Sequence, residues 1–250
     1  MRIGWLHDQP GYVGGAELTE RALRAAAPDG VQIVDCSPGR VAPGLDRYAV
    51  HNCVTYSLDD LRGIEGRPAV KLWNDVGGWY DEPVRGWLDS HAQAICLSPL
   101  QAEYMGLPDA LLIPPAIDLD PFEAAALQSN GDRRGAVCVG SWRNHGKGAR
   151  VVERWAAENG GVDFYGGGPF APQASQPVAH AGMPGLLARY ETFVFLPQVI
   201  EPFGRCAAEA WAAGCTLVVN GLVGAAWWLR ERPEALVSAA EDFWEAVLDA

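Results

Sequence analysis

The chain has 250 residues, 49% of them apolar, which is enough for one large hydrophobic core or two cores of ordinary size. We expect two compact domains. Its 31 acidic and 19 basic residues give a formal net charge of −12, and both halves of the chain carry an acidic excess. This balance disfavours non-specific binding to nucleic acid through phosphate neutralisation, although it leaves room for a local basic groove.

The six cysteines are scattered, with no Cys-x-x-Cys pair and no histidine cluster at metal-ligand spacing. We therefore expect no metal site and no disulfide framework, but reduced and mostly buried thiols in a cytoplasmic protein. The N-terminus runs into an apolar strand at Ile3 without a basic leader, and no stretch approaches the length of a transmembrane segment. The sequence carries no signal for or against peripheral membrane contact.

The first half of the chain alternates short apolar runs with helical patterns. It begins with a predicted strand over 3–6, a Gly/Pro-rich loop over 9–15 and a helix over 16–27. Further strands are predicted at 31–35, 48–50, 69–73, 93–97 and 111–113. This alternation predicts a parallel sheet covered on both faces.

A stretch of weak periodicity over 116–134 is typical of a connector, and a second strand-helix series follows it. Its predicted strands are 136–139, 162–165, 193–196 and 216–219, and its predicted helices are 149–158, 184–190, 204–213, 223–231 and 240–249. The fold class is therefore α/β with two Rossmann-like domains, 1–117 and 118–250, and a last helix that can pack back on the first domain.

The segment from Glu201 to Glu209, Glu-Pro-Phe-Gly-Arg-Cys-Ala-Ala-Glu, follows a predicted strand and enters a predicted helix. A helix that starts near Phe203 or Gly204 leaves the N–H groups of Phe203, Gly204 and Arg205 free to attract an anion. Glu201 and Glu209 can accept hydrogen bonds from hydroxyl groups. Phosphate plus sugar is the ligand that this combination favours. The alternative is a surface loop with a solvated Glu201 and with Glu209 on an outer helix face.

The same segment, with a proline after the strand and Ala-Ala-Gly at the end of the helix, resembles the donor-site signature of retaining GT-B glycosyltransferases. The chain is similar to their large nucleotide-sugar family four. This resemblance implies two Rossmann-like domains with an interdomain cleft. It also implies that Glu201 contacts hydroxyls of the donor sugar and that Glu209 holds the ribose diol.

Shorter motifs extend the resemblance in the same order along the chain. Gly14 and Gly15 are similar to the family's glycine loop, whose backbone approaches the donor diphosphate. Residues 112–118 resemble a Pro-x-Gly-Ile-Asp segment with alanine at the glycine position, and 165–169 resemble a Gly-x-Gly-Pro turn. The region that ends in Gly182 and Met183 lies where the family's base-contacting loop is expected. For the glycine pair alone, an ordinary turn before a helix is the alternative.

A basic turn over 139–148 carries Arg143 and Lys147, and it resembles the family's Gly-Arg and Lys-Gly segment that neutralises the diphosphate. The turn departs from that pattern, because Ser141 follows the glycine and the lysine comes one residue later. The phosphate role is therefore better supported for Lys147 than for Arg143. A solvated basic turn is the alternative.

The acceptor side is expected in the first domain. Asn74 and Asp75 lie where the family commonly has a histidine, and asparagine can bind a hydroxyl group but cannot act as a base. His7 and Asp8, at the end of the first strand, also face the expected cleft, although a structural role is the more common one there. A set of three tryptophans is interpreted as core or rim packing, with an aromatic platform as the alternative: Trp73, Trp79 and Trp87.

The resemblance implies a retaining, metal-independent glycosyltransferase that needs no cofactor and uses a UDP- or GDP-type nucleotide sugar as its donor. The acceptor is a glycan, a protein or a small molecule. Two alternatives stay open. One is a glycosyltransferase that modifies DNA bases, which the acidic balance disfavours. The other is a non-catalytic nucleotide-sugar-binding module, which Asn74 and Ser141 support.

Overall fold

The computed structural model describes residues 1–8, 14–129, 131 and 133–250. The chain divides into two compact units, which we call unit 1 (residues 1–117 and 231–250) and unit 2 (residues 118–230). Each unit contains one sheet whose strand pairs are all parallel, with helices in the connections. The predicted α/β fold class is therefore confirmed.

The sheet of unit 1 has six strands in the order β2-β1-β3-β4-β5-β6. Their bounds are Arg2–Leu6 (β1), Gln32–Cys36 (β2), Arg47–Val50 (β3), Ala69–Trp73 (β4), Gln93–Cys96 (β5) and Leu111–Leu112 (β6). The predicted strands match these to within about two residues. Strand β4 is buried along its whole length, which explains why every residue of it except Lys71 is apolar.

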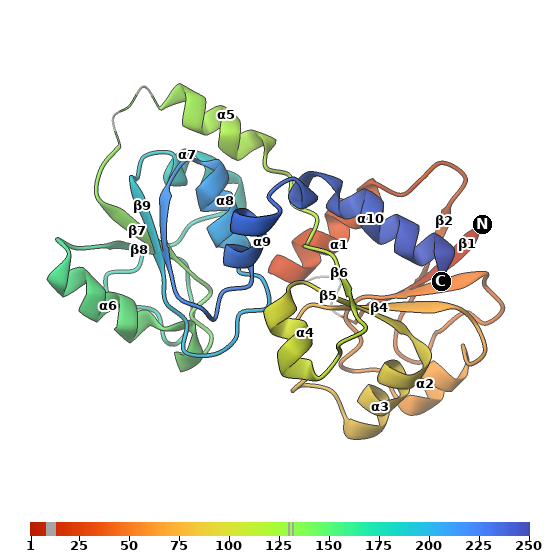
Figure 1. The fold of residues 1–250 in the computed structure, drawn as a ribbon. Helices are drawn as coiled ribbons and strands as arrows, with labels where there is room; N and C mark the ends of the chain where they lie inside the picture. Colours follow the sequence, from red (N-terminus) through yellow and green to blue (C-terminus); the bar gives the residue numbers. More distant parts are fainter. Residues whose placement is uncertain (9–13, 130, 132) are drawn as a thin grey trace. The chain divides into compact units, whose positions relative to one another are not determined.

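Helices cover both faces of this sheet, with α1 and α10 on one face and α2 and α3 on the other (Figure 1). The helices of unit 1 are Gly15–Ala25 (α1), Leu58–Arg62 (α2), Glu82–His91 (α3), Pro99–Met105 (α4) and Ala235–Asp249 (α10). Helix α10 starts five residues before the predicted 240. The indole Nε1 of Trp244 on this helix donates to the carbonyl of Leu23 on α1 at 2.8 Å. Trp244 also packs against Trp5 of β1, so the last helix contributes to the core of unit 1.

The sheet of unit 2 has four strands in the order β10-β9-β7-β8. Their bounds are Ala136–Val139 (β7), Asp163–Tyr165 (β8), Thr192–Phe195 (β9) and Thr216–Val219 (β10). The helices are Asp120–Gln128 (α5), Ala149–Glu158 (α6), Met183–Leu187 (α7), Arg205–Ala212 (α8) and Ala225–Glu231 (α9), with 3₁₀ turns at His145–Lys147 (η1) and His180–Gly182 (η2). The chain passes from β7 to β8 on one side and then to β9 on the other. The strand order therefore reverses between β7 and β9.

The connector predicted over 116–134 contains a helix that was not predicted, α5, over residues 120–128. Only Phe122 of this helix is fully buried, so the segment has almost no apolar periodicity to detect. Its signals are a proline in the first turn and a run of three alanines over 124–126, which favour helix locally.

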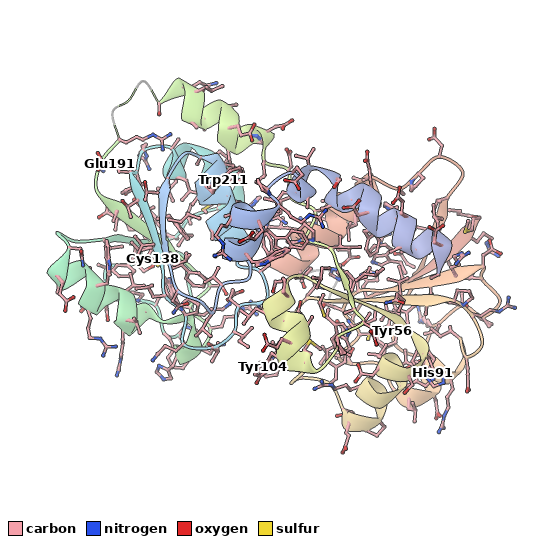
Figure 2. All side chains as sticks on the ribbon, in the orientation of Figure 1. Tyr56, His91, Tyr104, Cys138, Glu191 and Trp211 are labelled. Atoms are coloured by element: carbon pink, nitrogen blue, oxygen red, sulfur yellow. The ribbon has the colours of Figure 1, made fainter. Side chains whose placement is uncertain are left out.

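The core of unit 2 is built around Trp142, which is fully buried after β7 and clusters with Cys138, Phe164 and Val194. Figure 2 labels Cys138 of this cluster. All six cysteines of the chain are free, and all except the half-buried Cys206 are buried. No helix within the described residues has both the length and the apolar character that a membrane crossing requires.

Candidate functional site

Lys147 and Glu201 meet where the strand order of unit 2 reverses. Lys147 ends the η1 turn after β7, and Glu201 follows β9, the strand beside it. The ammonium Nζ of Lys147 donates a short hydrogen bond to Oε2 of Glu201. Both side chains stay accessible, with exposed fractions of 25% and 18%. Ligands of open parallel sheets bind at the carboxyl ends of strands at such a reversal, so this pair marks a binding position.

Glycine allows the two loops to approach each other closely. Gly148 has φ +78°, and a Cβ atom there would lie 2.0 Å from the carbonyl oxygen of Leu196. Beside this contact, the N–H of Gln198 donates to the carbonyl of Gly146 at 2.8 Å. The backbone after β7 therefore lies directly against the backbone after β9, which brings Lys147 to Glu201.

The backbone of Glu201 is held by the segment that follows β10. Its N–H donates to the carbonyl of Leu222 at 2.8 Å, and its carbonyl accepts from Gly224 at 3.0 Å. The side-chain amide of Asn220 also donates to the carbonyl of Pro197 at 2.7 Å. Glu201 is thus fixed on both sides and is not a solvated loop residue.

The helix after Glu201 starts later than the sequence predicts. Helix α8 begins at Arg205, with Gly204 as its N-cap in the left-handed region (φ +87°). A Cβ atom on Gly204 would lie 2.9 Å from Val223, so this position requires glycine. Phe203 is buried before the cap and does not belong to the helix. Phe203 therefore lies outside the set of N–H groups at the start of the helix, which begins with the capping Gly204 and Arg205.

Glu209 lies in the middle of α8 and is only 1% exposed. Its Oε1 accepts a hydrogen bond from Nε of Arg205 at 2.8 Å and lies 3.2 Å from Nε2 of His180 on η2. The alternative that placed Glu209 on an outer helix face is therefore wrong. The contact between His180 and this carboxylate joins segments that are distant in the chain, so only the fold reveals it.

The remaining residues predicted for the donor side lie in loops and at helix ends. Arg143 is exposed in the loop that carries Lys147, just after the buried Trp142. Gly182 ends η2, and Met183 opens α7 with its side chain buried. Gly14 caps α1 and Gly15 is its first residue, while the loop residues 9–13 before them lie outside the described residues.

In unit 1, His7 and Asp8 take part in separate contacts. The Nδ1 atom of His7 lies 3.2 Å from Oε1 of Glu20 on α1, and Nε2 lies 3.5 Å from Asp35. The carboxylate of Asp8 accepts from the backbone N–H of Thr55 at 2.8 Å, which holds the loop after β3. Both residues therefore already have partners within unit 1.

Asn74, at the end of β4, meets a histidine that the sequence analysis missed. Its Nδ2 lies 3.2 Å from Nε2 of His51, which directly follows the neighbouring strand β3. Burial lowers the pKa of His51 from 6.5 to about 3, so the ring is neutral at pH 7. The sequence signal for His51 is its position directly after a predicted strand, which it shares with His7. The carboxylate of the adjacent Asp75 accepts from the N–H of Gly77 at 2.6 Å.

Lys71 is a buried cation within β4. Its Nζ donates to the carbonyl of His51, to the carbonyl of Leu72 at 3.1 Å and to the hydroxyl of Tyr80 at 2.9 Å. An ammonium group has three N–H donors, so these three acceptors satisfy it. Burial lowers the pKa of Lys71. The signal in the sequence for this residue is a lysine inside an otherwise apolar strand.

The three tryptophans of the possible aromatic platform differ in burial. Trp73 and Trp87 are buried, with exposed fractions of 1% and 7%, as core packing predicts. Trp79 is 72% exposed and does not fit that interpretation. Within the described part of the chain, no group of three or more His, Cys, Asp or Glu side chains is arranged to hold a metal ion.

Comparison with solved structures shows which known fold this architecture matches. HepE from Anabaena, solved in complex with UDP and glucose, is 14% identical and superimposes with a TM-score of 0.67 over 99% of this chain and 92% of that one. The chain has the GT-B fold. AviGT4, a glycosyltransferase of avilamycin A biosynthesis, is 15% identical with a TM-score of 0.64, covering 99% and 88% of the two chains.

A third GT-B structure is an α-glucosyltransferase in complex with UDP-glucose and DNA containing an abasic site. It is 10% identical, with a TM-score of 0.60 over 99% of this chain and 95% of that one. No protein-family model matches the chain, and no curated protein matches it in sequence. The GT-B fold expected from the sequence is therefore confirmed, and at these identities the likeness extends to the fold alone.

Proposed function

We propose that this protein is a glycosyltransferase that uses a nucleotide sugar as its donor and retains the anomeric configuration. The observation that carries the proposal is the Lys147–Glu201 pair at the strand-order reversal of unit 2. It combines a cation for phosphate with a carboxylate for sugar hydroxyls at the position where α/β sheets bind ligands. The GT-B fold and the UDP and UDP-glucose complexes of similar structures support it.

The donor contacts that we propose lie mainly in unit 2. Lys147 and Arg143 neutralise the diphosphate, assisted by the N–H groups at the start of α8, while Glu201 accepts hydrogen bonds from hydroxyls of the sugar. The buried Glu209 holds the ribose diol, with its carboxylate oriented by Arg205 and His180. The backbone at Gly182 and Met183 faces the base.

The chemistry that these groups support is cleavage of the bond between the anomeric carbon and the diphosphate oxygen. The electron pair leaves with the diphosphate, so fixed cations and N–H donors stabilise the transition state more than the ground state. The acceptor oxygen bonds to the anomeric carbon on the face that the diphosphate leaves, and its proton passes to the departing phosphate oxygen. This route needs no covalent nucleophile and no metal ion.

The test of donor binding is a thermal-shift screen with UDP, UDP-glucose, GDP and GDP-mannose. A donor at 100 times its dissociation constant adds about 2.7 kcal/mol of stability. We expect one nucleotide and its sugar to stabilise the protein, and no stabilisation by any of the four contradicts the proposal. Retention is tested separately by NMR of the product, where an inverted anomer contradicts the mechanism but not donor binding.

A DNA-base glycosyltransferase is the second candidate, because one similar structure was solved with UDP-glucose and DNA. The net charge of −12 disfavours it. A duplex-DNA gel shift that weakens steeply with added salt would favour this candidate over a carbohydrate acceptor. A non-catalytic binding module is distinguished by tight donor binding without transfer or donor hydrolysis over a panel of acceptors.

A further inference from the structure

The segment between β4 and α3 forms a short loop, residues 74–80, whose two ends are tied to buried side chains of unit 1. At its start, the amide Nε2 of Gln101 donates to the carbonyls of Trp73 and Asp75 at 2.9 and 2.6 Å. Gln101 is 0% exposed, and its Oε1 accepts from the N–H of Leu97 at 2.6 Å. This one amide therefore fixes the backbone on both sides of Asn74.

The end of the 74–80 loop is fixed by Lys71. Its ammonium group donates to the hydroxyl of Tyr80 at 2.9 Å and to the carbonyl of His51. The ring of Tyr80 also packs against the ring of Trp73, with centroids 5.2 Å apart. Both ends of the loop are therefore fixed by buried side chains without a ligand, which reduces the ordering that binding requires.

The side chain of Asn74 is held as firmly as its backbone. His51 is neutral, and its Nδ1 faces the Glu20 carboxylate at 3.7 Å, which favours the tautomer with the proton on Nδ1. The Nε2 atom is then an acceptor, and it receives the Nδ2 hydrogen of Asn74 at 3.2 Å. This assignment directs the amide nitrogen towards His51, so Oδ1 of the half-buried Asn74 is the group available to a ligand.

Trp79 adds an apolar surface to the same loop. Its side chain is 72% exposed, although the adjacent Tyr80 is buried. The loop itself contains no basic residue, and Arg85, which lies against Gly77, is paired with Asp89 at 3.5 Å. An exposed indole and an amide oxygen on the same short loop suit a neutral ring that has both an apolar face and hydroxyl groups. They do not suit a phosphorylated acceptor.

We propose that the 74–80 loop binds the acceptor and that the acceptor is a neutral carbohydrate. The indole of Trp79 packs on the apolar face of one sugar ring, and Oδ1 of Asn74 accepts a hydrogen bond from one of its hydroxyls. His51 and Gln101 are positioning residues that act through Asn74. The proposal rests on the proposed function, because it names the second substrate of that reaction.

The test is saturation-transfer NMR of the wild-type protein, in the presence of UDP, with methyl α-glucoside, maltose and N-acetylglucosamine. We expect at least one of these sugars to bind and the Trp79→Ala variant to weaken its binding about tenfold. Trp79→Phe keeps an aromatic face and restores most of the affinity. Trp211→Ala, which removes an exposed aromatic side chain of unit 2, is the control and leaves sugar binding unchanged (Figure 2).

The positioning role is tested with a double-mutant cycle at His51 and Asn74. If His51 acts only by holding the amide, Asn74→Ala and His51→Ala each weaken sugar binding by about three- to tenfold, and the double variant is no weaker than Asn74→Ala alone. His51→Gln supplies an acceptor again and restores part of the affinity. Additive losses contradict positioning through Asn74. If a His51 variant does not fold, the surface variant Trp79→Ala still tests acceptor binding by the 74–80 loop.

Donor binding and sugar binding are measured separately, so a failure of this inference can be distinguished from a failure of the proposed function. Stabilisation by UDP-glucose measures donor binding in unit 2, and the Trp79 and Asn74 variants are expected to keep it. If donor binding is present but none of the sugars binds, or if Trp79→Ala binds them as the wild type does, the acceptor assignment is wrong. If no nucleotide sugar binds the wild-type protein, the proposed function fails, whatever the sugars do.

Discussion

The ammonium group of Lys147 donates a short hydrogen bond to the carboxylate of Glu201, although 53 residues separate them in the chain. The cation that we assign to phosphate and the carboxylate that we assign to sugar therefore neutralise each other without a ligand. A nucleotide sugar offers each of them a new partner, a phosphate oxygen for the lysine and hydroxyl groups for the glutamate. Under the proposed function, binding of the donor exchanges this ion pair for two ligand contacts.

Separate substitutions at this pair distinguish the two contacts. Lys147→Ala is expected to lower the affinity for UDP and for UDP-glucose alike, by about 10- to 100-fold, because a charge-assisted hydrogen bond contributes about 1.5–3 kcal/mol. Glu201→Gln is expected to leave UDP binding largely intact and to remove the preference for the sugar-bearing form. Isothermal titration calorimetry with both ligands measures this, and equal losses in both variants contradict separate roles.

Glu209→Ala is expected to weaken UDP and UDP-glucose binding equally, since the ribose is common to both. It also leaves the largely buried Arg205 without this carboxylate, so we expect a loss of about 1–3 kcal/mol in the free energy of unfolding. Glu209→Gln keeps the side-chain volume and is the matched control for packing. Urea unfolding and calorimetry measure the two effects, and a variant with full stability and full UDP affinity would rule out the assignment.

Gly204→Ala is expected to destabilise the protein by about 1–3 kcal/mol, because alanine at φ +87° is strained and its Cβ lies 2.9 Å from Val223. Gly185→Ala is the matched control, since that exposed glycine of α7 has open space around it and no positive φ. The control is expected to gain about 0.5 kcal/mol in the helix. Denaturant unfolding of both variants provides the measurement, and similar stabilities would contradict the cap geometry.

Burial of His51 predicts a pH dependence of stability. The pKa of this histidine is lowered from 6.5 to about 3 in the folded state, so the unfolded chain binds the proton first as the pH falls. Its contribution is complete above pH 6.5 and is lost on acidification towards pH 3. Between pH 7 and pH 5 the wild-type protein therefore loses about 2 kcal/mol through His51.

Urea unfolding at pH 7, 6 and 5 tests this dependence in the wild type and in His51→Gln, which has no titrating ring and is expected to show a flatter profile. Parallel profiles for the wild type and His51→Gln would contradict a lowered pKa of His51 in the folded state.

Much of the fold and part of the candidate site could be predicted from local patterns. The strand 136–139 was recognisable because a buried parallel strand is a continuous apolar run, and in 69–73 only Lys71 interrupts such a run. Helix α6 was predicted to the residue by its strong amphipathic period. The segment from Glu201 to Glu209 was found because a strand, a glycine turn and a helix start lie within a few residues of one another.

The sequence by itself determined the two α/β series, the position of Glu201 after its strand and the presence of Lys147 in a basic turn, because each depends on residues that are close in the chain. Only the tertiary structure decided that Lys147 contacts Glu201, that His180 contacts the buried Glu209 and that His51 holds Asn74. These contacts join neighbouring strands or segments far apart in sequence. They depend on strand order, which is set by packing of the whole sheet and leaves no local pattern to read.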